Sequence, residues 1–364
     1  MMAPEEPGED KFITLLELFR KGEYKDLTKF CDQLLKQFPN SAKLHNIQGG
    51  AYNRLKNFDV SLDFYYRALR INPKYAEAYN NLGNTYKAMG DFESSIKNFK
   101  EAILLKPDFA EAYNNLGACF QQQGDIRLAI TQFQKAINIK IDFLDAYINN
   151  GNALRIDGNI AESIETLKIA QQFAPHSSDV YFSMGLSFWD GERFEEAIKN
   201  FETVIMIKPD HFEAYNFLGN ALKSVGQTER AVNVFEQVLS LKEDFFEVHR
   251  HLAFAKKYYG FEDQIQQLLG FLECEDLKDN DYININFTLG KIYEDIKQYE
   301  KSFSFLLEGN RLRRKELKYS IKDDISLFNS IKHRFKNQDV DTKTVTPSHS
   351  GINIIPIFII GMPR

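Results

Sequence analysis

The sequence has 364 residues, of which 43% are hydrophobic and 26% are charged, with 45 Lys and Arg against 51 Asp and Glu. This composition excludes disordered, collagen-like and disulfide-scaffold proteins, because it offers ample apolar material for a core and no compositional extreme. A net charge of −6 excludes a chain that binds nucleic acid through its overall charge. The three cysteines are widely spaced and odd in number, which argues against disulfides and a Cys-x-x-Cys metal site and predicts a reducing, cytoplasmic location.

Neither end of the chain has the pattern of a targeting or membrane-spanning segment. Residues 1–7 contain no basic stretch followed by an apolar core, so they are no secretory signal, and we expect them to be disordered. The most apolar run, Ile352–Met362, is too short to cross a bilayer as a helix and contains Pro356. We therefore expect a soluble protein that does not enter membranes.

An internal repeat of 34 residues organises most of the sequence. Ala76–Gly83 reads AEAYNNLG, and the same residues return at Ala110–Gly117, 34 positions later. Six units run without insertion from Ala42 to Phe245, and we number the residues of each unit from position 1 to position 34. Position 8 is Gly in all six units, position 20 is Ser or Ala, and position 24 is Tyr, Phe or Leu.

Each unit is predicted to form two amphipathic helices. Positions 4, 7 and 11 lie on one face of a first helix, and positions 20, 24, 27 and 28 lie on one face of a second. Turns such as Gly90-Asp91 separate the two helices, and a proline at position 32 ends the second helix in four units. Because one such hairpin cannot bury its apolar face alone, consecutive hairpins must stack and share a continuous core.

This pattern resembles the tetratricopeptide repeat, most closely in the unit Ala76–Phe109. That unit has the motif residues Tyr79, Leu82, Gly83, Tyr86, Phe99, Ala102 and Pro107 in place. The resemblance implies an all-α fold, a right-handed superhelix of stacked helical pairs. We predict a solenoid over residues 8–316, with its best units at 42–245, a degenerate segment at 246–279 and a further unit at 283–316.

In that family the first helix of each pair lines a concave groove, at about positions 2, 5, 6, 9, 12 and 13. Those positions are rich in amides here, and the predicted peptide-groove residues are Asn80, Asn81, Asn84, Asn114, Asn115, Asn149, Asn152, Asn216 and Asn220. A side-chain amide both donates and accepts, so such rows match the backbone of an extended peptide without reading its side chains. A purely structural use of the same amides is the alternative interpretation.

A basic helix and a polar linker are predicted after the repeats. Residues 311–336 hold nine Lys or Arg against three acidic residues, and we expect a helix over residues 317–336. A solvated helix face is the default interpretation of such a run, and attraction of anions is the alternative. Residues 337–350 are polar and contain a proline, so we expect a linker there.

The end of the sequence, residues 351–364, predicts the first strand and loop of a truncated α/β domain. Ile357–Ile360 is a short apolar run bounded by Pro and Gly. With the repeats before it, this ending resembles the junction in bacterial tetratricopeptide-repeat sulfotransferases, where Gly-x-Pro-Arg opens the loop that binds 3′-phosphoadenosine 5′-phosphosulfate. The resemblance implies that Gly361, Pro363 and Arg364 begin this cofactor loop, whose following Ser-Gly-Thr-Thr is absent from this sequence.

Three interpretations of function follow from the sequence. The repeats are the protein- or peptide-binding arm of a sulfotransferase whose catalytic domain is missing from this chain, which would then be inactive. Alternatively, the chain is a stand-alone interaction scaffold with no enzymatic role. A third interpretation is the repeat arm of an O-linked N-acetylglucosamine-type glycosyltransferase, because the row Asn81, Asn115, Asn149 resembles the asparagine ladder of that family. The sequence indicates no metal site, and it does not identify the groove ligand, the sulfate acceptor or the oligomeric state.

Overall fold

The computed structural model describes residues 6–260, 263–274, 276–317 and 321–336, and within these residues the regular secondary structure consists of nineteen α-helices. The predicted all-helical repeat fold is therefore present. Of the residues 1–7 that were predicted to be disordered, residues 1–5 lie outside the described residues, as do the predicted linker at 337–350 and the predicted strand at 351–364. Among the described helices, none is both long enough and apolar enough to cross a membrane.

The helices follow one another along the chain in pairs, and in every pair but α15 and α16 the two helices pack against each other. The first helices of the pairs are α1 (Glu9–Lys21), α3 (Ala42–Arg54), α5 (Ala76–Met89), α7 (Ala110–Gln123), α9 (Leu144–Ile156), α11 (Ser178–Asp190), α13 (Phe212–Ser224), α15 (Phe246–Ala255) and α17 (Asp279–Asp295). The second helices are α2 (Tyr24–Gln37), α4 (Phe58–Ile71), α6 (Phe92–Leu105), α8 (Ile126–Ile139), α10 (Ile160–Phe173), α12 (Phe194–Ile207), α14 (Thr228–Leu241), α16 (Asp263–Leu272) and α18 (Tyr299–Glu316). The basic helix α19 spans Ile321–Lys336.

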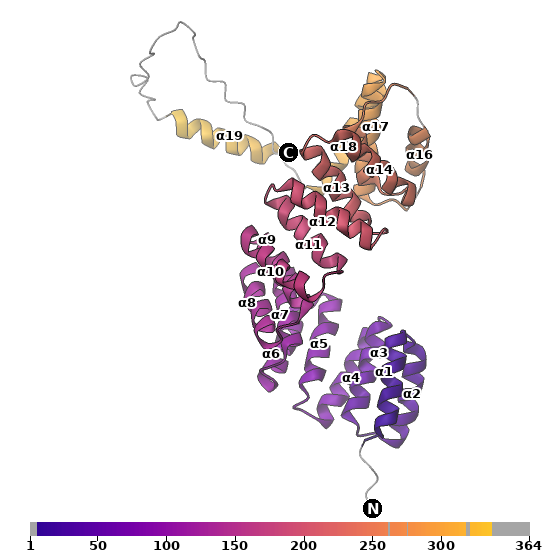
Figure 1. Cartoon of the computed structure of the whole chain (residues 1–364), viewed down its shortest axis with the longest axis vertical. Helices are drawn as coiled ribbons and strands as arrows, with labels where there is room; N and C mark the ends of the chain where they lie inside the picture. The colour runs from indigo at the N-terminus through magenta and orange to yellow at the C-terminus, as the bar shows by residue number, and fades with distance from the viewer. Residues whose placement is uncertain (1–5, 261–262, 275, 318–320, 337–364) are drawn as a thin grey trace, which may run out of the picture.

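The pairs stack side by side into an elongated solenoid (Figure 1). From α2 to α15 each helix packs against the next one in the chain. The pattern changes after α15, which packs against α17, while the short helix α16 lies beside them and also contacts α17. The irregular part of the stack thus coincides with the sequence segment that departs most from the repeat.

Glycine at position 8 allows the two helices of a pair to approach closely. A Cβ atom built on Gly83 would lie 2.6 Å from Cε1 of Phe99, the fully buried ring at position 24 of the same unit. Gly219 shows the same relation to Phe235, at 2.2 Å. The large residue at position 24 therefore fills the space that any side chain at position 8 would need, which is why the two positions repeat together.

Serine at position 20 adds a hydrogen bond across this contact. The buried hydroxyls of Ser61, Ser95 and Ser163 donate to the carbonyl oxygens of position 8 in their own units, at 2.7–2.8 Å. Ser302 makes the same bond to Gly290 at 2.8 Å. Each bond satisfies a polar group that is buried between the helices, and such a bond contributes about 1 kcal/mol. The small size of position 20 was predicted from the sequence, but this bond was not.

The turn inside a pair uses left-handed backbone at one residue. Gly90 and Gly124 have φ values of 82° and 88° and accordingly carry no steric penalty. In the unit of α11 and α12 the glycine, Gly191, comes one place earlier, and Glu192 takes the left-handed conformation with φ of 56°. That shift leaves a non-glycine residue in a strained conformation.

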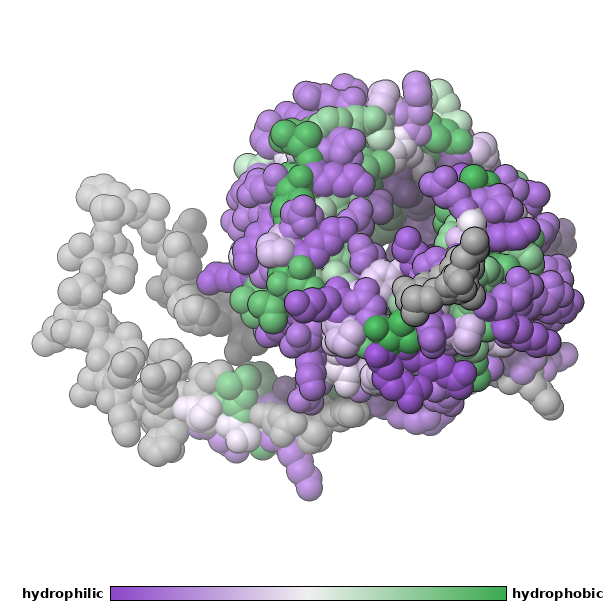
Figure 2. Space-filling view, turned by 90° about the horizontal axis from the view of Figure 1, so that it is seen from below, coloured by the Kyte–Doolittle hydropathy of each residue, from purple (hydrophilic) through white to green (hydrophobic). Residues whose placement is uncertain are grey.

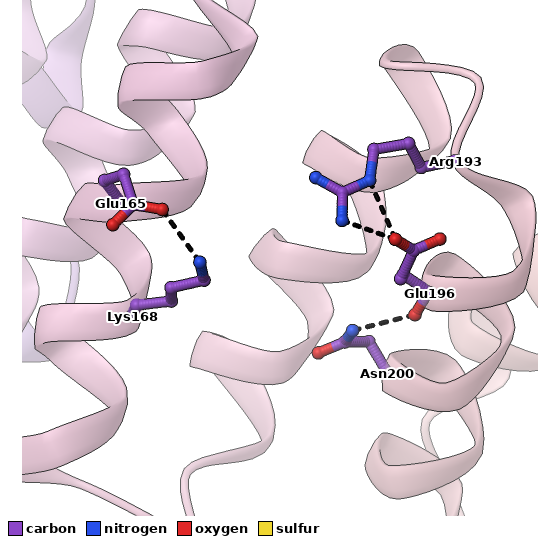
Figure 3. A network of polar contacts seen from close by, with 5 residues as sticks. All are labelled: Glu165, Lys168, Arg193, Glu196 and Asn200. Atoms are coloured by element: carbon purple, nitrogen blue, oxygen red, sulfur yellow. Dashed lines mark hydrogen bonds and ion pairs between the residues drawn. The ribbon is translucent and has the colours of Figure 1, made fainter.

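Polar side chains on the second helices form ion pairs that are exposed to solvent. Figure 3 shows Lys168 bonded to Glu165 at 2.8 Å, Arg193 paired with Glu196, and Nδ2 of Asn200 donating to the carbonyl oxygen of Glu196 at 2.8 Å. Because solvent screens such pairs, each contributes less than about 1 kcal/mol. These ion pairs hydrate the outer surface of the second helices.

Candidate functional site

The concave groove is the surface formed by positions 5, 6, 9, 12 and 13 of the first helices. Figure 2, a view from the N-terminal end, shows a hollow in the middle of the molecule. Residues from α1, α3 and α5 line one pocket of this surface, which shows that these helices face a common space. All nine predicted groove amides belong to first helices, from α5 to α13.

Five of these nine amides bond to an asparagine of a neighbouring unit, in a series that we call the amide relay. The asparagine at position 6 donates through Nδ2 to Oδ1 of the asparagine at position 5 of the preceding unit. This bond measures 3.0 Å in each of three pairs: Asn81 to Asn46, Asn115 to Asn80, and Asn149 to Asn114. The acceptor asparagines are buried, and the bonds therefore join the stacked hairpins.

The amide relay stops after Asn149, because the next contact, between α9 and α11, has Ile148 at position 5 and Ser183 at position 6, and aromatic rings follow at the contact after that. At the α11–α13 contact, Phe182 occupies position 5 and Phe217 occupies position 6 of the next unit, with ring centroids 5.8 Å apart in an edge-on arrangement. Trp189 lies beside them, 6.4 Å from Phe217 between centroids. An apolar ring contact thus takes the place of the hydrogen bond, and the groove changes from amide-lined to aromatic in its middle.

At the next contact, between α13 and α15, His251 takes the place of the position-6 asparagine and continues the relay. Nδ1 of His251 lies 2.7 Å from Oδ1 of Asn216 and 3.1 Å from Nδ2 of Asn220. Burial, with smaller contributions from Arg250 and Lys223, lowers the pKa of His251 to about 4, so the ring is neutral near pH 7. With its proton on Nδ1, the neutral ring donates to Asn216 as the asparagines do in the other units.

Two predicted groove residues, Asn84 and Asn152, have no side-chain partner among the described residues. Both occupy position 9, one helical turn beyond the relay. Oδ1 of Asn152 and Nε of Arg155, on the same helix, are both without a hydrogen-bond partner there. Both atoms are also buried from solvent, so the surrounding side chains enclose them and they are not open to a peptide in the groove.

A pocket of about 470 Å³ opens beside Asn84 at the N-terminal end of the groove. Its apolar side is formed by Leu16 and Phe19 of α1, and Gly50 of α3 leaves space at its centre. Asn84 and Arg54 supply hydrogen-bond donors at the pocket. A small number of polar groups around an apolar floor is the usual composition of a binding site for a side chain or small ligand.

The sequence indicated the amides of this site but not its apolar residues. Leu16 and Phe19 belong to the first helical pair, which lacks the repeat signature, so nothing in the sequence placed them at the groove. The ring residues Phe182 and Phe217 were not predicted as groove residues from the sequence. The row that resembles a glycosyltransferase ladder, which includes Asn81, is engaged in the amide relay and so supports a structural role for these amides.

The predicted basic run at residues 311–336 is partly neutralised within α18. Arg311 pairs with Glu308 at 2.6 Å, and Arg313 pairs with Glu316 at 2.7 Å. These i,i+3 pairs fit the solvated-face interpretation of the run better than the anion-binding one. The predicted cofactor residues Gly361, Pro363 and Arg364 lie outside the described residues.

Comparison with known proteins identifies the repeats. The chain matches the family described as TPR repeat at residues 49–90 and 83–124, and the family described as tetratricopeptide repeat at residues 110–143, 178–211 and 212–245. The last three segments have the same boundaries as the 34-residue units in the sequence. The chain therefore contains tetratricopeptide repeats, and the matched segments lie between residues 49 and 245.

Solved structures agree with this fold. The APC/C hetero-tetramer Cut9–Hcn1 is similar with a TM-score of 0.52 and 14% identity, over 82% of this chain and 55% of that chain. PilF of Pseudomonas aeruginosa has a TM-score of 0.52 and 14% identity, over 58% and 96%. YrrB, titled a TPR protein with an unusual peptide-binding site, has a TM-score of 0.42 and 20% identity, over 51% and 96%. No curated protein matches the chain in sequence.

Proposed function

We propose that this tetratricopeptide-repeat chain is a scaffold that binds an extended segment of a partner protein in its concave groove. The observation that carries the proposal is the pocket beside Asn84, where apolar residues of α1 meet amide groups of α3 and α5. An extended segment presents backbone donors and acceptors along its length and a side chain at every second residue toward one face. The pocket would take one such side chain.

Asn84 carries the contact with the peptide backbone in this proposal. Each relay amide already commits one donor or acceptor to a neighbouring unit, so it has fewer groups left for a peptide than an amide without a partner. Asn84 has all of its amide groups available, because its side chain has no hydrogen-bond partner among the described residues and lines the pocket. We therefore assign peptide binding to Asn84 and inter-unit bonding to the relay residues at positions 5 and 6.

The assignment is testable with a peptide selected from a random library on the immobilised full chain. Its affinity is measured through the fluorescence of Trp189, the single tryptophan, which lies in the groove. Asn84→Ala is expected to weaken binding about tenfold, the equivalent of roughly 1.4 kcal/mol for a lost hydrogen bond. Asn98→Ala, a half-buried asparagine of a second helix that bonds to Ser94, is the matched control and should leave affinity unchanged.

A second variant tests the pocket itself. A Cβ atom on Gly50 would make only ordinary contacts, with the nearest atom 3.6 Å away, so Gly50→Leu is expected to fold while its side chain fills the pocket. Loss of peptide binding in this variant, with normal binding in the exposed helix control Gly270→Leu, supports the proposal. Unchanged affinity in both Asn84→Ala and Gly50→Leu would show that the selected peptide binds elsewhere.

As a second candidate we propose that the repeats recruit the substrate of a sulfotransferase domain that follows them. The support is the sequence at Ile357–Arg364, which resembles the start of the 3′-phosphoadenosine 5′-phosphosulfate loop. In this proposal Gly361, Pro363 and Arg364 contribute to cofactor binding. A reading frame that continues with Ser-Gly-Thr-Thr supports this candidate, and one that continues with unrelated codons contradicts it. The spacing of the cysteines further supports a reducing, cytoplasmic location as part of either proposal.

A further inference from the structure

The outward face of α18 carries an apolar stripe that no described helix covers. Tyr299, Phe303 and Leu307 are spaced four residues apart, so they lie in line on one side of the helix. Their exposed fractions are 64%, 67% and 60%. We call these three residues the α18 stripe.

The corresponding residues of earlier units are covered or polar. Tyr299 and Phe303 occupy positions 17 and 21 of their unit. In preceding units the residue at position 21 packs beneath the next hairpin; Ile164 and Ile198, for example, are only 4% and 6% exposed. Leu307 occupies position 25, which is polar in five of the six regular units: Lys100, Gln134, Lys168, Glu202 and Glu236. The α18 stripe therefore has the character of a packing surface at the end of the stack, and terminal repeats of solenoids need such a surface covered.

Helix α19 carries a second exposed apolar face. Ile325 and Phe328 lie three residues apart on one side of the helix and are 53% and 49% exposed, and the neighbouring Leu327 is 58% exposed. Figure 1 shows α19 apart from the stack. Four residues, 317–320, connect α18 to α19, the same number that joins α4 to α5 and α6 to α7. A connection of this length suits an antiparallel pair of helices.

We propose that α19 folds back onto the α18 stripe and closes the C-terminal end of the solenoid. In the antiparallel arrangement Leu307 meets Phe328, because Leu307 lies ten residues before Leu317 and Phe328 lies eight residues after Ser320. The basic last turn of α18 then lies beside the first turn of α19, where the sequence has Asp323 and Asp324.

The short connection also favours α19 over a second copy of the chain as the occupant. A tether of a few residues holds α19 near the stripe at an effective concentration of about the millimolar range, above the concentration of free chain in ordinary solution. Closure would cover the exposed apolar side chains of both helices at once. It involves no residue of the groove, so it holds whether or not the groove binds a peptide.

Disulfide formation in the full chain tests the contact. The background is Cys274→Ser, because Cys274 is the exposed cysteine, whereas Cys31 and Cys119 are buried. Into it we place the pair Leu307→Cys and Phe328→Cys, and the control pair Leu307→Cys and Ser330→Cys, since Ser330 lies on the opposite side of α19. A disulfide requires Cα atoms within about 7 Å, so only a docked helix forms one readily.

The expected result is an intramolecular disulfide in the 307/328 pair that forms at least about tenfold faster than in the 307/330 control, in a monomeric chain. Adding Phe303→Asp to the 307/328 pair should lower its rate to that of the control, and the exposed position keeps this change compatible with folding. Equal rates in the two pairs would overturn the proposal. Intermolecular disulfides, or a dimer by light scattering that Phe303→Asp dissociates, would also overturn it by assigning the stripe to a second copy.

Discussion

Replacing His251 by Asn should make the stability of the solenoid less sensitive to acid. His251 is the histidine of the amide relay, at 2.7 Å from Oδ1 of Asn216, and three other units have asparagine at the same position 6: Asn81, Asn115 and Asn149. An asparagine at 251 can donate to Asn216 as Asn115 donates to Asn80. The variant therefore keeps the bond between units and removes the titratable ring.

The size of the effect follows from the pKa of the ring. Burial lowers the pKa of His251 from its ordinary value of 6.5 to about 4 in the folded chain, so the unfolded chain takes up the proton first as the pH falls. The stabilisation by the neutral ring is complete above pH 6.5 and is lost progressively as the pH falls toward 4. Integrated over that interval, the loss between about pH 7 and about pH 5 is ~2 kcal/mol.

Urea denaturation of the full chain, followed by circular dichroism at the two pH values, measures this difference. The free energy of unfolding of the wild type should fall by ~2 kcal/mol more than that of His251→Asn. Burial also lowers the pKa of His45 and His249, so the variant retains part of the acid sensitivity. Equal losses in wild type and variant would refute the assignment of a buried, neutral ring to His251.

Three further changes test the packing. Gly83→Ala should destabilise the chain by about 1–3 kcal/mol in the same urea assay, because the added methyl overlaps the buried ring at position 24; a neutral result would refute the close approach of the helices. Asn115→Ala should cost about 1 kcal/mol of stability while leaving peptide affinity unchanged, and the reverse pattern would contradict the separation of relay and binding residues. With a thiol reagent such as Ellman's, only Cys274 should react in the folded chain, because Cys31 and Cys119 are buried. Burial also raises the pKa of both of these thiols, that of Cys31 to about 12. Rapid reaction of more than one thiol would contradict this expectation.

The fold was readable from the sequence because one steric requirement repeats in every unit. Position 8 must be glycine where position 24 is a large residue, and Gly83 with Phe99 shows the overlap that any other choice would create. A constraint that recurs at a fixed spacing is visible without any knowledge of tertiary structure. The two-helix units at 42–245 follow from it directly.

The partners of the groove amides could not be read in the same way. Asn115 bonds to Asn80, 35 residues earlier, and this pairing depends on how far one hairpin is rotated relative to the next. The sequence places both residues on the first helices but does not give that rotation. The contribution of Leu16 and Phe19 to the pocket depends on the same geometry, in a pair of helices without the repeat signature.

The relay shows that residue choice at one groove position is set by the neighbouring unit. Asn80 and Asn115 satisfy one another, and so do the rings of Phe182 and Phe217, but an asparagine facing a phenylalanine would leave a buried amide without a partner. The interruption of the asparagine row at Phe217 is therefore a change of the pair, in which both members became aromatic. It follows that the amides at positions 5 and 6 are determined by the stacking of the hairpins, whereas Asn84, one helical turn away, lines the pocket and is open to a ligand.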